Sequence, residues 1–212
     1  MPRVPLPDPS LNADAPRAGL APAAGRRRAG SASQRTHPMI LSTEDPAVRL
    51  RAWAPSDHDS LVRYGNNRLV WRNLTDMFPH PYTNADAVAW VRTAIEPGPS
   101  ILLAIDLEGE AIGGAGVIAS EGNSFHTGQF GYWLGQPHWG KGIATRCARA
   151  LRDHAFAGGR FKRLEAPVFA WNPASMKVLE KAGFIREGVL RRSVLKDGRL
   201  IDSVVYAATR DG

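Results

Sequence analysis

The 212-residue sequence contains one cysteine, Cys147, so it cannot form an intramolecular disulfide. A chain with so little cysteine is typical of a reducing compartment. No apolar run approaches the roughly 18 residues that a membrane-spanning helix needs. The N-terminal stretch also lacks the apolar core, about 7–15 residues long, of a secretory signal. These absences predict a cytoplasmic protein without a membrane segment.

Most of the chain also lacks an excess of positive charge. Residues 1–38 contain six Arg and two Asp, which is a net charge of +4 out of the +7 of the whole chain. A domain that binds nucleic acid usually concentrates basic charge on its fold. We therefore do not expect a nucleic-acid partner, except through Arg26, Arg27 and Arg28 of the tail. A solvated tail without a partner is the favoured reading.

Residues 1–38 are poor in large apolar side chains and rich in Pro, Ala, Arg, Gly and Ser. Such a segment cannot bury enough surface to offset the loss of chain entropy on folding. We expect a disordered tail over residues 1–38 and one folded domain over residues 39–212, with regular structure starting near Val48. Met39 is an alternative start of the protein.

The hydrophobic pattern of the remaining chain predicts a mixed α/β domain. Helices are expected to start at 55–57 and to span about 84–96, 140–157 and 172–182, and the stretch 70–82 is expected to be irregular. Ser56 and Thr83 are the predicted N-caps of the first two helices. The second helix is expected to bury one face, made of Ala87, Val88, Val91 and Ile95. Strands are predicted at 48–53, 101–106, 111–119, 129–134, 163–170, 184–192 and 200–208.

The most informative segment is 129–145, where an apolar strand leads through a short turn into the longest predicted helix. Gly140 and Gly142 lie where this helix begins, so its first backbone N–H groups are left without side-chain caps. The helix dipole adds about half a positive charge at the same place. Lys141 supplies a further cation. The segment predicts a site for a phosphate or pyrophosphate group.

Four blocks of sequence carry a resemblance to a known family. They are Phe78-Pro79-His80-Pro81-Tyr82-Thr83 with Asp86-Ala87 and Trp90; Gly131-Tyr132-Trp133-Leu134; Trp139-Gly140-Lys141-Gly142-Ile143-Ala144-Thr145; and Asn172-Pro173-Ala174-Ser175 with Val178 to Phe184, Glu187-Gly188 and Tyr206. In this order and spacing, they resemble the GNAT superfamily of acyl-CoA-dependent N-acyltransferases. The similar branch contains the ribosomal-protein-alanine N-acetyltransferases, and the resemblance covers about residues 45–210.

The resemblance implies a fold and an activity. The fold would be a central, mostly antiparallel sheet of six to seven strands, splayed between its fourth and fifth strands and flanked by about four helices. The activity would be transfer of an acetyl group from acetyl-CoA to an amine. The acceptor would be a protein N-terminal α-amine or a small-molecule amine, and the protein a monomer or homodimer. No metal site is expected.

The resemblance also assigns residues to the cofactor. The coenzyme A arm would lie in the gap of the splayed sheet, and the backbone amide near Leu134 would stabilise the oxyanion. Asn172 would contact the arm, although an Asn here is equally suited to cap its helix. Ser175 would lie near the sulfur and help to protonate the thiolate; its alternative is a hydrogen bond to its own helix. The pyrophosphate would be held by Trp139, Gly140, Lys141, Gly142, Ile143, Ala144 and Thr145.

The proton acceptor for the attacking amine is harder to predict. Relatives often carry a glutamate where this chain has Gln129, and many carry another where it has Arg146. His80 and Glu187 are the remaining candidates for a base, with ordinary loop or surface roles as their alternatives. Water can also remove the proton. Two other functions stay open: a coenzyme A-binding sensor or scaffold without turnover, and an RNA or ribosome associate acting through the basic tail.

Overall fold

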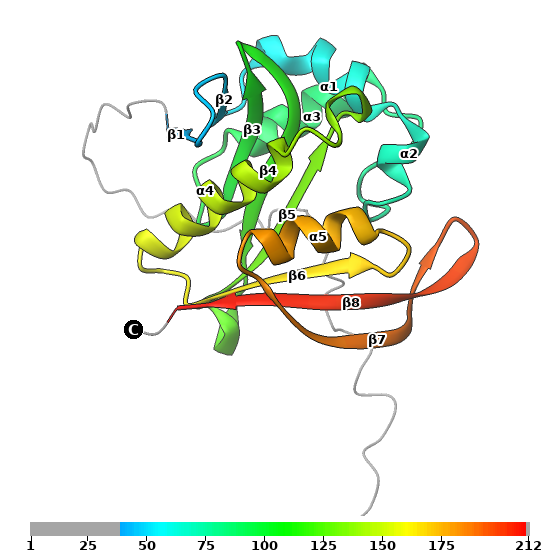
Figure 1. Ribbon diagram of the computed structural model, residues 1–212. Coiled ribbons are helices and arrows are strands. Elements are labelled where there is room, and N and C mark those ends of the chain that lie inside the picture. Colours follow the sequence, from blue (N-terminus) through cyan, green and yellow to red (C-terminus); the bar gives the residue numbers. More distant parts are fainter. Residues whose placement is uncertain (1–38, 211–212) are drawn as a thin grey trace, which may run out of the picture.

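The computed structural model describes residues 39–210 as one open sheet with helices on both faces (Figure 1). The strand order is β1-β2-β3-β4-β5-β6-β8-β7, and every neighbouring pair is antiparallel except the parallel pair β5–β6. The strands are β1 (Ile40–Ser42), β2 (Val48–Arg51), β3 (Ile101–Leu107), β4 (Glu110–Ala119), β5 (Thr127–Leu134), β6 (Arg163–Phe169), β7 (Ile185–Lys196) and β8 (Arg199–Thr209). The predicted mixed α/β fold is confirmed.

Helices on opposite faces bury alternate residues of the same strands. Leu103 and Ile105 of β3 pack in the core that α4 and α5 cover, whereas Ala104 packs with α1 and α3. This alternation follows from the two-residue period of a strand. The helices are α1 (His58–Gly65), α2 (Arg68–Trp71), α3 (Asn84–Ala94), α4 (Ile143–Ala157) and α5 (Pro173–Lys181). None of the helices in residues 39–210 is long and apolar enough to cross a bilayer.

Three predictions about the number and extent of elements need correction. The sheet has eight strands rather than six or seven, because β1 pairs with β2 and Leu41 packs against the main core. Regular structure therefore begins at Ile40 and not near Val48. A strand of three residues gives little periodic signal. The fifth helix is the four-residue α2, at the edge of the stretch expected to be irregular. The predicted tail, 1–38, lies outside the described residues.

Two local predictions about helices are also wrong in part. Thr83 caps α3 as expected, but Ser56 caps nothing; the carboxylate of Asp57 instead accepts the backbone N–H of Ala54. In α3, Ala87 and Val91 are buried, whereas Val88 and Ile95 are 44% and 49% exposed. The buried stripe of α3 is narrower than predicted because the helix rests on the sheet through two positions one turn apart.

The sheet splits between β5 and β6, as predicted. Only three residue pairs join these strands, from Thr127 and Arg163 to Gln129 and Glu165. Beyond Glu165 the strands separate, while β5 remains paired with β4 as far as Leu134 and β6 with β8 as far as Phe169. The fold therefore leaves a gap inside the sheet, and each strand that borders the gap stays hydrogen-bonded to its other neighbour, β4 or β8.

Candidate functional site

The turn after β5 holds two glycines in the left-handed region, and this conformation aims backbone N–H groups outward. Gly140 and Gly142 each have φ of 76°, a value that only glycine adopts without strain. Helix α4 therefore begins at Ile143, three residues later than the sequence predicts. Gly142 is its N-cap and has no side chain to satisfy the first N–H groups. The glycine turn is thus present at the start of α4 without a side-chain cap, and its binding of a phosphate stays a prediction.

Trp139 fixes this turn to the end of β5. Its indole N–H donates to the carbonyl of Leu134 at 2.7 Å. The N–H of Gly135 donates to Ile112 on β4 at 2.8 Å. Since successive N–H groups of a strand point to opposite sides, the N–H of Leu134 faces the split. A backbone donor therefore lies where the sequence predicts an oxyanion site.

Arg146 lies beside the glycine turn, at a position where the resemblance leads us to expect a glutamate. Its guanidinium donates to Asp45 at 3.0 Å and to the carbonyl of Lys141 at 3.3 Å. A Cβ added to Gly142 would lie 3.1 Å from the same guanidinium. The charge of Arg146 is balanced by Asp45, so Lys141 and the open N–H groups supply the positive potential at the N-terminus of α4. This arrangement favours an anionic ligand.

Ser175 reaches the split from α5 and meets β5 across it. Its hydroxyl lies 2.8 Å from the hydroxyl of Tyr132, which also donates to the Ser175 carbonyl at 3.1 Å. The carboxamide oxygen of Asn172 accepts the backbone N–H of Ser175 at 3.1 Å and so caps α5. The capping alternative for Asn172 is therefore what the structure contains, and its contact with a cofactor stays a prediction.

Tyr132 was not predicted to have a role, yet it positions the Ser175 hydroxyl. Burial raises the pKa of Tyr132 to about 12, against a smaller opposing effect of its hydrogen bond to Ser175. The phenol therefore keeps its proton at neutral pH. The phenol has one hydrogen, which it can donate either to the carbonyl or to the hydroxyl oxygen of Ser175. In the second arrangement the serine hydrogen is free to point into the split.

The face of the split away from α4 and α5 is open. Phe130 and Leu134 point into the core beneath these helices, so the alternate residues of β5 point to the other face. Gly131 lies in the middle of this face, and a Cβ added to it would meet nothing within 4 Å. The residues that flank the opening on this side are Gln129, Gly131 and Trp133 from β5 and Glu165, Pro167 and Phe169 from β6.

A carboxylate that the sequence did not point to stands at the fork of the split. Glu165 is the register partner of Gln129 in the last residue pair before β5 and β6 separate. Its side chain is 43% exposed and accepts from Arg163 at 2.7 Å. The structure thus places Glu165 beside Gln129, the glutamine that stands where relatives often carry a glutamate. Glu165 reaches this position through the register of the parallel strand pair, and the sequence of either strand alone does not show that register.

The two predicted bases lie on segments other than the two strands that border the split. The side chain of Glu187 on β7 is 42% exposed, and the guanidinium of Arg163 binds both of its oxygens. This hydrogen-bonded pairing lowers the pKa of Glu187. His80 is exposed and stacks on Trp71, with ring centroids 5.6 Å apart. No contact joins either residue to Ser175 among the described residues. Their catalytic roles stay predictions.

Two other reactive side chains are packed into the fold. Burial raises the pKa of the Cys147 thiol to about 12, and the side chain has no exposed surface. Burial and the charge of Lys141 lower the pKa of His138, which packs edge-on against Tyr64. Cys147 therefore stays a neutral thiol and His138 a neutral imidazole at pH 7, in keeping with packing roles.

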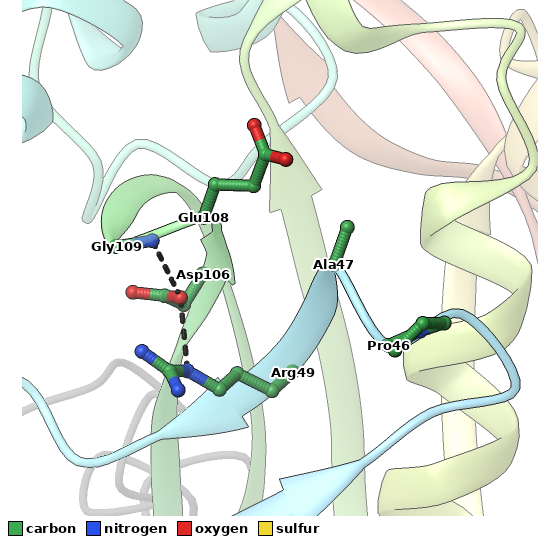
Figure 2. Close-up of a pocket in the computed structure, with 6 residues that line it drawn as sticks. All are labelled: Pro46, Ala47, Arg49, Asp106, Glu108 and Gly109. Atoms are coloured by element: carbon green, nitrogen blue, oxygen red, sulfur yellow. Dashed lines mark hydrogen bonds and ion pairs between the residues drawn. The ribbon is translucent and has the colours of Figure 1, made fainter.

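A second hollow of the surface, at the far edge of the sheet, is occupied by structural contacts. Figure 2 shows Asp106 at its centre, where one oxygen accepts from Arg49 and from the backbone of Gly109 at 3.0 and 3.1 Å. The other oxygen accepts from Arg51 at 2.6 Å. The buried carboxylate is thus fully used to hold the β3–β4 turn, and the split remains the better candidate.

Comparison with known proteins identifies the family of the domain. Residues 47–185 match the family model described as "Acetyltransferase (GNAT) domain". Over 84 residues the chain is 43% identical to "Probable N-acetyltransferase YjcK" of Bacillus subtilis (strain 168), covering 40% of this chain and 46% of that protein. Over 85 residues it is 33% identical to "Ribosomal-protein-serine acetyltransferase" of Escherichia coli (strain K12), covering 40% and 48%. The chain spans about half the length of these curated relatives.

A solved structure extends the likeness over most of the chain. "Mycobacterium smegmatis RimJ in complex with CoA-disulfide" superposes with a TM-score of 0.67 at 26% sequence identity. The superposition covers 81% of this chain and 86% of that one. The two chains therefore share their overall fold over most of their lengths.

Proposed function

The chain belongs to the acetyltransferase (GNAT) domain family, and on that basis we propose that it transfers an acetyl group from acetyl-CoA to an amine. The observation that carries the proposal is the split itself. One gap in the sheet has an anion-binding turn at its end, Ser175 on one face and an open surface on the other. A thioester lying in this gap is accessible to an amine from the opposite side.

Acetyl-CoA would be held mainly by backbone groups. The open N–H groups at Gly142, Ile143, Ala144 and Thr145, with the cation of Lys141, suit the pyrophosphate. The pantetheine arm would take the place of the missing strand between β5 and β6, where the edge of β5 offers unpaired backbone groups. The solved relative named as a complex with CoA-disulfide supports this choice of ligand.

The transfer would proceed by direct attack. The neutral amine attacks the thioester carbon, and the oxygen of the tetrahedral intermediate accepts the Leu134 N–H that faces the split. Collapse of the intermediate breaks the carbon–sulfur bond and releases the thiolate. The Ser175 hydroxyl, positioned by Tyr132, donates a hydrogen bond or proton to the sulfur.

The amine must also lose a proton. Glu165 is the carboxylate at the fork, on the open face, and we assign proton acceptance to it through water. His80 and Glu187 remain weaker candidates. His80 stacks on Trp71 of α2, and Arg163 binds both oxygens of Glu187 but only one oxygen of Glu165. Since water can also remove this proton, loss of Glu165 is expected to slow the transfer and not to abolish it.

The acceptor would be a primary amine of a protein N-terminus or of a small molecule. One relative is named for a ribosomal-protein serine, which favours a protein α-amine. A coenzyme A-binding protein without turnover is less favoured, because the split places Ser175 and the open face on either side of one gap. An RNA-binding role through residues 1–38 has no support from the described part of the chain.

The test is thiol release from acetyl-CoA in the presence of a panel of primary amines and N-terminal peptides. The proposal expects release of coenzyme A that depends on the amine and is matched by acetylated product. Tight binding of coenzyme A without release for any amine would leave the binding site intact and refute the transfer.

A further inference from the structure

Helix α2 and its flanking residues bridge the open end of the split. On the β5 side, the Asn67 carboxamide donates to the side chain of Gln136 at 2.8 Å. On the other side, Arg68 binds Asp197 at the tip of the β7–β8 hairpin, and Arg72 lies over the ring of Trp171. Figure 1 shows α2 above the hairpin tip and the end of β6. The segment therefore forms one wall of the open face.

This wall carries three cations, and two of them are neutralised. Arg68 donates to both oxygens of Asp197 at 2.8 and 2.9 Å. Lys196, which is 1% exposed, lies 2.6 Å from Asp76 and 3.6 Å above the Trp71 ring. These ion pairs hold α2 against the hairpin, and the charge of each cation is balanced by its carboxylate partner.

Arg72 is the cation that stays uncompensated. Its guanidinium is half-buried, and within residues 39–210 no carboxylate lies close enough to pair with it. Its contact is the ring of Trp171, 5.0 Å from the centroid. A guanidinium held over an aromatic face keeps its N–H groups free at its edge. Arg72 is thus held in place without its hydrogen-bonding capacity being used.

The position of Arg72 connects it to the reacting groups. Trp171 immediately precedes Asn172, which caps α5 through the N–H of Ser175. Phe169, at the end of β6 on the open face, contacts Trp171 edge-on with centroids 6.2 Å apart. Arg72 therefore stands at the mouth of the open face, while Glu165 stands at the fork. Arg72 is therefore a charge on the acceptor surface that no carboxylate of residues 39–210 balances, because Glu165 at the fork is paired with Arg163.

From this arrangement we infer that the acceptor carries a carboxylate besides its amine, and that Arg72 binds that carboxylate. The inference rests on the proposed acetyl transfer. The planar guanidinium matches a carboxylate with two parallel hydrogen bonds. The same contact would hold the amine in the split, toward the thioester, so Arg72 would determine specificity rather than take part in the chemical step.

The experiment compares acceptors that differ only in the charge of one group. One arm uses an L-amino acid and its amide, and a second uses N-terminal peptides with Asp or Asn at the second residue. The measured quantity is the ratio of kcat/KM for the acid to that for its neutral partner, in the wild type and in Arg72→Leu. Forming the ratio in both proteins cancels the intrinsic difference between the two amines.

We expect Arg72→Leu to lower this ratio about 10- to 100-fold in one arm, the range for a hydrogen bond to a charged group. That arm then identifies the acid as part of a small acceptor or of a peptide. Arg160→Leu is the matched control, because Arg160 also lies over an aromatic ring, that of Phe161, but stands before β6 at the end opposite Arg72. It should leave the ratio unchanged. Arg72→Lys should restore only part of it, because an ammonium cannot bind both oxygens in one plane.

Equal losses for acid and neutral acceptors in Arg72→Leu, in both arms, would overturn the inference while leaving acetyl transfer intact. If no amine supports transfer, calorimetric binding of the same acceptor pairs to the protein with coenzyme A decides instead. A preference for the acid that depends on Arg72 upholds the inference, and its absence refutes it.

Discussion

The two faces of the split are built in different ways. The face beneath α4 and α5 consists of local structure: a turn with two left-handed glycines, the N-terminus of α4, and the Asn172 cap that presents Ser175. The open face is assembled from distant segments, since α2, the β6–α5 loop and the β7–β8 hairpin meet there. A face built from local structure suits a ligand that does not vary, such as coenzyme A. A face built from distant segments suits an acceptor that varies. Substitutions on the two faces should therefore have separable effects.

The largest expected effect is on the chemical step. Ser175→Ala removes the donor to the leaving sulfur and should lower kcat about 100-fold, with little change in the affinity for coenzyme A. Tyr132→Phe should lower kcat by less, because it only frees the serine to rotate. Stopped-flow or steady-state thiol release measures both. Ser193→Ala, a serine bonded to its own strand on β7, is the control and should behave as wild type.

The next effect concerns affinity on the cofactor face. Gly142→Ala places a Cβ on a residue with φ of 76°, at a strain of about 1–2 kcal/mol. The glycine turn should distort, and the Kd for coenzyme A should rise roughly 5- to 30-fold by calorimetry. Gly159→Ala carries a similar strain, with φ of 73° at the other end of α4. It should destabilise the protein without changing that Kd, and an equal rise in both variants would contradict the site.

A smaller effect is expected at the fork. Glu165→Gln removes the proposed proton acceptor and should lower kcat/KM for the amine about tenfold, mostly on the acidic side of the pH profile where the free amine is scarce. Glu187→Gln should leave the profile nearly unchanged. A larger loss in Glu187→Gln than in Glu165→Gln would assign the base to the exposed glutamate instead.

Filling the open face should affect the acceptor alone. Gly131→Ala adds a methyl group where nothing lies within 4 Å, so the fold should tolerate it. The KM for the acceptor is expected to rise about threefold to fivefold, with an unchanged Kd for coenzyme A. A rise in the Kd for coenzyme A without a change in acceptor KM would place the acceptor elsewhere.

The smallest effect is on stability. Pairing with Arg163 lowers the pKa of Glu187, so the pair stabilises the fold above the ordinary glutamate pKa of about 4.3. That contribution is lost as the pH falls through the lower pKa of the folded state. Glu187→Gln should therefore be slightly less stable than wild type at pH 7, with the difference vanishing in acid. Urea unfolding at several pH values tests this, with the unpaired, exposed Glu121→Gln as control.

The contrast between the faces also explains what the sequence could predict. The glycine turn, the Thr83 cap and the strands of β3 to β8 depend on neighbouring residues, so their signals are local. Glu165, Tyr132 and Arg72 gain their positions from strand register and from contacts between segments tens of residues apart. No pattern within one segment shows such a position. For that reason the sequence shows that Gln129 replaces an expected carboxylate, but it does not show that Glu165 lies beside Gln129 in the parallel strand pair.

Initial-rate kinetics in which acetyl-CoA and the amine are both varied test the central claim most directly. An amine that attacks the thioester from the opposite face of one split requires both substrates to be bound together. The double-reciprocal lines should therefore intersect, and no coenzyme A should be released without amine. Parallel lines, or a burst of coenzyme A before amine is added, would contradict direct transfer across the split.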